Sequence, residues 1–217
     1  MYHIKEAFYT LQGEGARTGR ASVFCRFTGC NLWSGRESDR QHSACRFCDT
    51  DFVGSNGKNG GRFADTDTLA AHLAALWPHL PTAATPYVVF TGGEPLLQLD
   101  TPLIEAMQAR GFEVAVETNG TLPAPPGIDW LCVSPKGTTT LAIENGDELK
   151  LVYPQHDAPP SRFASLDFSH FFLQPMDTTG IASCGQPTTP LDAALAYCLA
   201  NPQWRLSLQI HKTLGIE

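Results

Sequence analysis

Short apolar runs recur along the chain, and most of them end directly in a polar or glycine-rich motif. Runs of this length bounded by turn residues predict buried strands. The motifs TGC, TGGEP, ETNG, SPK, QPMD and HK each follow one of these runs. We therefore expect strands over residues 22–27, 87–90, 113–116, 130–133, 149–153, 171–173 and 206–210.

Three helical patterns separate some of the runs. Leu69, Leu73 and Leu76 recur on one face of the segment 65–77, and the other two patterns cover 103–110 and 191–199. Strands that alternate with helices predict parallel pairing. Because three helices are too few for an eightfold barrel, we expect an α/β fold of the partial, open β/α barrel type. It should have about six or seven mainly parallel strands, with functional groups at their carboxyl ends.

Composition limits what this fold can do. A chain of 217 residues with 42% hydrophobic content can bury one core, so we expect a single domain over residues 1–217 with a flexible loop at 54–61. The net charge of -7 has no basic run, which disfavours binding to nucleic acid or to an anionic membrane. No apolar stretch approaches the ~20 residues of a membrane span, and the first residues lack a signal-peptide pattern. We expect a cytoplasmic protein.

Six of the seven cysteines divide into two groups. Cys25, Cys132 and Cys198 lie in apolar runs and are predicted to be core residues, whereas the surroundings of Cys184 decide nothing. The remaining three, at positions 30, 45 and 48, have the spacing C-x14-C-x2-C. A third cysteine disfavours a simple redox pair. A zinc site with His42 as the fourth ligand and an iron–sulfur cluster with one open iron both fit this spacing.

The motifs FYTLQGEG, FTGCNLW, CRFCDT, TGGEP, ETNG, SPK, QPMD and QIHK, in this order, resemble the 7-carboxy-7-deazaguanine synthase family of radical S-adenosylmethionine (SAM) enzymes. The resemblance extends from Lys5 to Glu217. TGGEP is shared with activases that make glycyl radicals on partner proteins, but LQGEG and QPMD argue against that class. The usual C-x3-C-x2-C has become C-x14-C-x2-C, which indicates an insertion at about 34–44. Lengthening a flexible loop costs only about 0.6 kcal/mol per doubling, so the insertion is tolerable.

The resemblance implies three cofactors. Cys30, Cys45 and Cys48 would hold a [4Fe–4S] cluster whose open iron binds SAM, and Thr50 would bind Mg²⁺, although outside the family Thr50 reads as a turn residue. Glu117 and Asn119 could instead cap a strand end, which is the minor alternative. The implied SAM contacts are Phe47, Cys48, Asp49, Gly92, Gly93, Glu94, Glu117, Ser134, Pro135, Lys136, Gln174, Pro175, Met176 and Asp177.

The implied substrate is 6-carboxy-5,6,7,8-tetrahydropterin, a flat heterocycle that needs donors and acceptors along its edge and a cation for its carboxylate. Ring contraction with loss of ammonia would give 7-carboxy-7-deazaguanine for queuosine or other 7-deazapurines, a carbon–nitrogen lyase reaction with no general acid or base. A flavodoxin- or ferredoxin-like electron donor and a homodimer are also implied. The implied substrate contacts are Leu11, Gln12, Gly13, Glu14, Arg26, Thr91, His211 and Glu217, where many family members end in proline.

Overall fold

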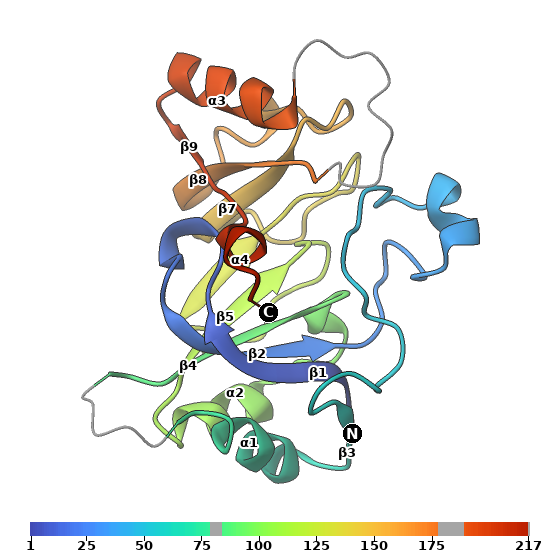
Figure 1. The fold of residues 1–217 in the computed structure, drawn as a ribbon, viewed down its shortest axis with the longest axis vertical. Helices are drawn as coiled ribbons and strands as arrows, with labels where there is room; N and C mark the ends of the chain where they lie inside the picture. The colour runs from blue at the N-terminus through green and yellow to red at the C-terminus, as the bar shows by residue number, and fades with distance from the viewer. Residues whose placement is uncertain (79–83, 178–188, 217) are drawn as a thin grey trace.

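The computed structural model describes residues 1–78, 84–177 and 189–216, and within them nine strands form one sheet. The sheet order is β3-β1-β2-β4-β5-β6-β7-β8-β9 (Figure 1). Neighbouring strands from β2 to β9 are parallel, while β1 is antiparallel to both β2 and β3. The prediction of a mainly parallel, open β/α sheet is confirmed. The strands are β1 (Tyr2–Leu11), β2 (Ala21–Phe27), β3 (Gly61–Phe63), β4 (Tyr87–Gly92), β5 (Glu113–Thr118), β6 (Trp130–Val133), β7 (Asn145–Tyr153), β8 (Asp167–Pro175) and β9 (Trp204–Leu206).

Side-chain caps fix the starts of the three longer helices. The Asp65 carboxylate accepts from the backbone N–H of Thr68, and the Asp100 carboxylate accepts from that of Leu103. Thr189 opens a third helix with a reciprocal capping box. These helices are α1 (Thr66–Ala74), α2 (Thr101–Gln108) and α3 (Pro190–Ala200), followed by the short α4 (Ile210–Leu214). The 3₁₀ helices are η1 (Gly15–Arg17), η2 (Glu37–His42), η3 (Pro95–Leu97) and η4 (Pro160–Arg162).

One face of the sheet is packed under helices. Apolar side chains of β1, β2, β4 and β5 form one core with α1 and α2, and those of β6 to β9 form a second core that includes α3. Figure 1 shows α1 and α2 at one end of the sheet and α3 at the other. Because side chains alternate along a strand, the next residues in each run face the opposite side.

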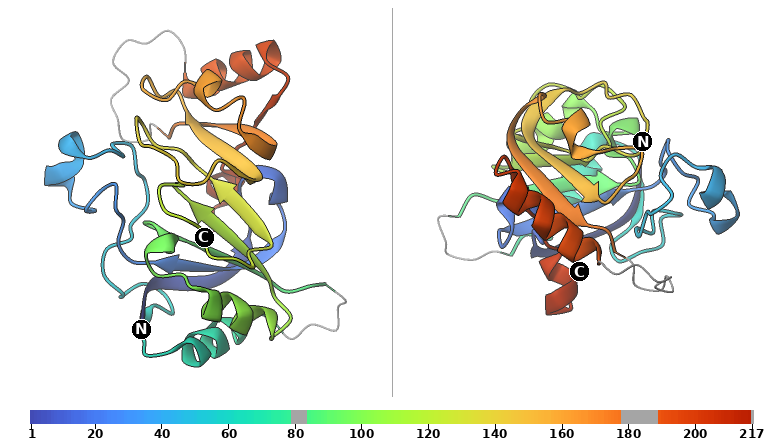
Figure 2. Two further views of the ribbon diagram at one scale, coloured as in Figure 1. Left: turned by 180° about the vertical axis from the view of Figure 1, so that it is seen from behind. Right: turned by 90° about the horizontal axis from the view of Figure 1, so that it is seen from above.

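The opposite, concave face carries polar side chains from five different strands. They are Arg26 of β2, Thr91 of β4, Glu117 of β5, Lys150 of β7 and Gln174 of β8, and all of them line one cavity. The parallel register places Arg26 directly beside Thr91. Figure 2 shows the sheet from above, curved around this side.

The structure corrects several expectations. β1 and β3 were not predicted, and the last strand is Trp204–Leu206 rather than 206–210, because Ile210 begins α4. Cys25 and Cys132 are buried as predicted, whereas Cys198 is only half-buried. Cys184 lies outside the described residues. Among the residues described, no helix has the length and apolar character that a membrane crossing requires.

Candidate active site

A cavity of about 470 Å³ lies on the concave side of the sheet, and its size is typical of small-molecule sites. Most of the predicted site residues line it. Leu11, Glu94, Pro135 and Met176 are not in its wall, and Glu217 lies outside the described residues. The predicted residues in the wall are Gln12, Gly13, Glu14, Arg26, Cys30, Cys45, Phe47, Cys48, Asp49, Thr50, Thr91, Gly92, Gly93, Glu117, Ser134, Lys136, Gln174, Pro175, Asp177 and His211.

The three cysteines of the C-x14-C-x2-C motif are free thiols in the wall of this cavity. A hydrogen bond with Cys45 lowers the pKa of Cys48 to about 6, and the same bond together with burial raises the pKa of Cys45. The sulfur of Cys30 accepts from the backbone N–H of Leu32 at 3.4 Å. All three sulfurs therefore lie on one wall, where a metal centre that binds thiolates could contact them.

Two glycines bring the TGGEP loop against the loop that carries Cys30. Gly92 has φ 145°, and a Cβ added at Gly93 would lie 2.1 Å from the carbonyl oxygen of Gly29. The backbone N–H of Glu94 donates to that same carbonyl at 2.9 Å. Only glycine permits this close approach, so the two loops are fixed to each other.

The carboxylate of Glu94 is fully buried and joins two strand-end loops. Its two oxygens accept from the Thr118 hydroxyl at 2.7 Å, the Asn119 N–H at 2.8 Å and the Leu96 N–H at 2.9 Å. Burial raises the pKa of Glu94, although these hydrogen bonds oppose the rise. The side chain therefore ties the TGGEP loop to the ETNG loop and leaves the cavity wall to backbone atoms.

Lys150 forms the centre of a buried charge network on the floor of the cavity. Its Nζ lies 2.5 Å from Glu14 Oε2 and 3.5 Å from Glu117 Oε2. Burial alone would raise the pKa of Glu14, but the Lys150 ammonium lowers it to about 2. Burial alone would lower the pKa of Lys150, but Glu117 and Glu14 raise it instead. Both carboxylates thus share Lys150 as a cationic partner, and the Lys150 side chain itself is buried.

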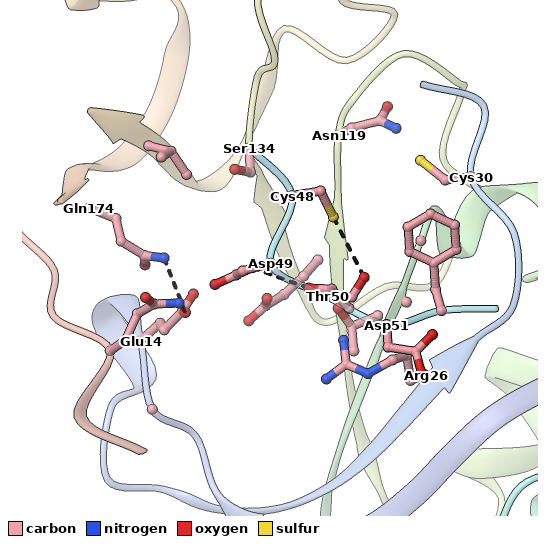
Figure 3. Close-up of a pocket in the computed structure, with 18 of the residues that line it drawn as sticks. Glu14, Arg26, Cys30, Cys48, Asp49, Thr50, Asp51, Asn119, Ser134 and Gln174 are labelled. Atoms are coloured by element: carbon pink, nitrogen blue, oxygen red, sulfur yellow. Dashed lines mark hydrogen bonds between the residues drawn. The ribbon is translucent and has the colours of Figure 1, made fainter. Parts of the chain in front are cut away.

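Three glutamine side chains extend this network. Gln174 and Gln209 donate to Glu14 Oε1 at 3.1 and 2.9 Å, and Gln12 donates to Glu117 Oε1 at 2.9 Å. Figure 3 shows Gln174 pointing at Glu14. Within the described residues the amide oxygen of Gln174 is buried without a hydrogen-bond partner. A buried acceptor left unpaired is costly, so this oxygen is suited to receive a donor from a ligand.

Oxygen and guanidinium groups line a second part of the wall. Arg26 Nε donates to Glu6 Oε1 at 2.8 Å, and Figure 3 shows the rest of the guanidinium directed into the pocket. The Thr50 hydroxyl lies 3.4 Å from Asp49 Oδ1. Asp51, on the other side of Thr50, pairs with Lys5 at 2.7 Å. This region offers a cation for an anionic ligand and the oxygen donors that a hard metal ion prefers.

The C-terminal segment closes the open side of the curved sheet. The N–H of Ile210 donates to the carbonyl of Gly13 at 3.0 Å, and a Cβ at Gly13 would lie 2.2 Å from His211 Nδ1. Lys212 pairs with Asp49 at 2.8 Å and with Asp177. The motif QIHK therefore joins the segment after β1 to Asp49, the residue after Cys48, and to Asp177, two residues after the end of β8.

Sequence reasoning missed Lys150, Gln209 and Lys212 as site residues. Lys150 gave a signal that could have found it, because it is the charged residue inside the apolar run 149–153. A charge in a buried strand requires partners, and here these are two glutamates. Gln209 and Lys212 also gave a signal, because both lie in the motif QIHK, from which only His211 was taken as a site residue.

The metal alternatives can be tested against the geometry. No group of three or more His, Cys, Asp or Glu side chains in the described part of the chain surrounds one metal-ion position, and His42 lies exposed in η2 outside the cavity wall. A zinc site needs four ligands around one ion, so the geometry does not favour it. In a [4Fe–4S] cluster each thiolate binds a different iron, so three separate thiols on one wall fit that donor set.

The fold and the cavity define a partial β/α barrel enzyme with a small-molecule site and a triad of free thiols. No family model matches the chain. A 7-carboxy-7-deazaguanine synthase of Bordetella pertussis is 63% identical over 215 residues, which cover 99% of each protein. One of Bradyrhizobium diazoefficiens is 59% identical and covers 100% of this chain and 99% of its own.

The structures agree with the sequences. The crystal structure of QueE from Escherichia coli matches with a TM-score of 0.68 and 26% identity, covering 96% of this chain and 93% of that one. The chain belongs to the 7-carboxy-7-deazaguanine synthase family. The resemblance predicted from the motifs is confirmed, and the activase alternative is wrong.

Proposed function

We propose that this chain converts 6-carboxy-5,6,7,8-tetrahydropterin into 7-carboxy-7-deazaguanine and ammonia, as a radical SAM lyase of 7-deazapurine biosynthesis. The product and ammonia together contain all the atoms of the substrate, so the reaction is redox-neutral overall. The proposal includes Mg²⁺, an external flavodoxin- or ferredoxin-like reductant, a homodimer and a cytoplasmic location. The observation that carries it is the convergence of the three cysteines and the TGG, SPK and QP segments on one cavity.

The cysteines and strand ends on one side of the cavity form the cofactor region of the proposal. Cys30, Cys45 and Cys48 hold the [4Fe–4S] cluster, and the backbone of Gly92 and Gly93 lies against SAM. When bound, the cluster and SAM would supply the one-electron radical chemistry of the reaction. Lys136 is held there by Ser134, whose hydroxyl accepts from its Nζ at 2.6 Å. Phe47, Asp49, Gln174, Pro175 and Asp177 complete this region.

The floor of the cavity binds the heterocycle in this proposal. Glu14 and Glu117 are acceptors for the N–H groups along the ring edge, and Lys150 pairs with both carboxylates and holds them in place. The unpaired amide oxygen of Gln174 and the side chain of Gln12 add further polar contacts. Because the acceptors along this edge are charged, an analogue without the ring N–H groups would lose these hydrogen bonds and bind less tightly.

Arg26 and Thr50 bind the carboxylate end of the substrate in the same proposal. Glu6 orients the Arg26 guanidinium through Nε, and the remaining N–H groups pair with the substrate carboxylate. The hydroxyl of Thr50 is a ligand of Mg²⁺, whose preference for oxygen fits Thr50 and the neighbouring Asp49. Thr91, next to Arg26 in the register, lies beside the same group.

The test is anaerobic reconstitution followed by incubation with SAM, a reductant, Mg²⁺ and the carboxylated pterin. Mass analysis should detect 7-carboxy-7-deazaguanine and ammonia, with formation dependent on all four additions. Formation of 5'-deoxyadenosine without the deazaguanine product would contradict the assigned substrate. Absence of a cluster with an open iron by electron paramagnetic resonance would contradict the radical SAM assignment itself.

A further inference from the structure

The segment from Cys30 to Cys48, called the cysteine loop below, contains the insertion at residues 34–44. The proposed cofactor and substrate regions use no residue of this insertion. The insertion projects from the body of the protein in each view (Figures 1 and 2), and no residue of its 3₁₀ helix η2 is buried. Closing such a loop costs little free energy. Closure alone, however, does not determine where Cys45 and Cys48 return, so specific contacts must do so.

Arg40, in the middle of the insertion, reaches back to the C-x-x-C segment. Its Nη1 donates to the carbonyl oxygen of Arg46 at 3.1 Å and to that of Cys48 at 3.0 Å. One guanidinium nitrogen carries two hydrogens, so it can serve both carbonyls at once. These two carbonyls lie on either side of Phe47, and holding them fixes the backbone on which Cys48 is mounted.

The guanidinium is itself held on two sides. It lies 4.1 Å from the centre of the Trp33 ring, and its Nε donates to Glu37 at 2.8 Å. Trp33 is 8% exposed and packs edge-on against Phe52, with 5.6 Å between ring centres. Arg40 therefore connects the backbone around Phe47 to Trp33, three residues after Cys30.

Backbone contacts secure the base of the insertion but not its far end. The N–H groups of Ala44 and Cys45 donate to the carbonyl of Leu32 at 3.2 and 3.4 Å. These bonds fix the backbone at Cys45 against Leu32. After Cys45, the side chain of Arg40 joins the insertion to the carbonyls of Arg46 and Cys48.

We propose that Arg40 is a positioning residue for the cysteine loop, which holds the C-x-x-C segment against Trp33 so that Cys45 and Cys48 face the cavity beside Cys30. The contacts of Arg40 with Trp33, Arg46 and Cys48 are called the brace below, and through them the insertion stabilises the position of the cysteine loop. A planar guanidinium can stack on an indole and donate along its edge at the same time, which a lysine ammonium does not reproduce. The consequence for the cluster rests on the function proposed above, whereas the brace itself does not.

The first test uses the full chain before reconstitution. Cys45 is 5% exposed, so its alkylation by iodoacetamide reports opening of the loop, and half-buried Cys198 on α3 is an internal reference. We expect Arg40→Met to raise the alkylation rate of Cys45 about tenfold, as loss of charge-assisted hydrogen bonds predicts. Arg36→Met is the matched control, because the side chain of Arg36 makes no hydrogen bond in the described residues.

Glu37→Gln is a milder variant that keeps the carbonyl contacts and weakens the hold on Nε. It should raise the Cys45 rate by a smaller factor than Arg40→Met. Equal Cys45 rates in wild type, Arg40→Met and Glu37→Gln would overturn the proposal. A rise in Arg36→Met equal to that in Arg40→Met would also overturn it, since it would show a general effect of charge loss.

The second test follows iron release from the reconstituted chain under a chelator. Arg40→Met should lose iron about tenfold faster than wild type and Arg36→Met, and its reduced cluster with SAM should show an altered electron paramagnetic resonance spectrum. Faster alkylation with unchanged iron release and spectrum would overturn the positioning role. If unaltered protein binds no iron while the alkylation result holds, the proposed function fails and the brace stands.

Discussion

Cys48 differs from the other cysteines in its surroundings. It has the lowered pKa, about 6, and lies in the cavity wall beside Cys45. We expect Cys48→Ala to abolish the reductive cleavage of SAM, because one cluster ligand is lost. The measurement is 5'-deoxyadenosine formed under dithionite by the reconstituted protein. The control is Cys198→Ala, on α3 outside the cavity wall, which should form as much 5'-deoxyadenosine as the wild type. Undiminished 5'-deoxyadenosine from Cys48→Ala would show that Cys48 is not a cluster ligand.

Lys150 is a buried cation that pairs with the half-buried carboxylates of Glu14 and Glu117, and its loss should be costly. Breaking a buried ion pair from one side typically costs about 3–5 kcal/mol, because the remaining charge is unpaired. We expect Lys150→Met to lower the free energy of unfolding by about this amount at pH 7, measured by urea denaturation. Arg62→Met removes an exposed cation from β3 and should stay within about 0.5 kcal/mol of wild type.

The same pair makes a prediction about pH. In the wild type the pKa of Glu14 is lowered from 4.5 to about 2, so its stabilising contribution is complete above pH 4.5 and is lost as the pH falls toward 2. Without Lys150, burial raises the pKa of Glu14, and protonation then relieves the unpaired charge. The stability difference between Lys150→Met and wild type should therefore shrink as the pH falls from 7 to 5. A constant difference in urea denaturation over this range would contradict this account.

At the level of single residues, the sequence predicted most of the cavity wall because motifs follow strand ends. Cys30, Gly93 and Ser134 could be placed in this way. Glu94 could not, since a sequence does not show that its carboxylate turns away to three donors in neighbouring loops. The partnership of Glu14 with Lys150 joins residues 136 positions apart, a pairing that local patterns do not contain.

At the level of elements, the contact between the loops after β2 and β4 depends on glycine. A Cβ at Gly93 would meet the Gly29 carbonyl oxygen at 2.1 Å and the Cβ of Cys30 at 2.9 Å. We expect Gly93→Ala to cost about 1–3 kcal/mol of stability, as overpacking does, and to reduce iron bound per chain after reconstitution. Urea denaturation and iron analysis measure the two effects.

Gly61→Ala in β3 is the control for this substitution. Its Cβ would meet only the Phe63 ring, at 3.5 and 3.7 Å, which is ordinary contact. It should leave iron binding unchanged and stability within about 0.5 kcal/mol. Equal stability and equal iron content in the two variants would show that the close approach at Gly93 is not required.

Six of the seven strands predicted from apolar runs correspond to β2 and to β4 through β8, and three predicted helices correspond to α1, α2 and α3. The seventh prediction, 206–210, shares only Leu206 with β9. β1 was missed because Lys5 and Glu6 interrupt its apolar residues. Lys5 is nevertheless buried, since Asp51, Val53 and Asn56 accept from its ammonium. At the end of the chain, Ser207 donates to the Leu173 carbonyl and Ile210 donates to Gly13, so the run 206–210 turns from a strand into a helix.

At the level of the whole molecule, the open barrel is closed by its two chain ends. The edge strands of the sheet are β3 and β9, and the contacts of Ser207, Ile210 and Lys212 join the segment after β9 to Gly15, Gly13 and Asp49. The loop after β1 forms part of the cavity floor, and α4 with His211 forms one side of the cavity. The cavity wall is thus assembled from segments about 200 residues apart in sequence, a closure that periodicity along the chain does not predict.

This closure predicts that α4 serves binding more than stability. α4 has no buried residue, so a chain ending at Gln209 should unfold within about 4 °C of the full chain. The same truncation removes His211 and the Lys212 bridges, which opens the floor of the cavity to water and weakens the charge-assisted contacts there. We expect the KM for the pterin to rise at least about tenfold, the equivalent of one charge-assisted hydrogen bond, while SAM cleavage without substrate persists. Lys212→Met should give a smaller rise in KM.

A truncated chain with the KM of the full chain would show that the barrel needs no closure on this side. A large fall in melting temperature would show that α4 stabilises the fold and not only the site.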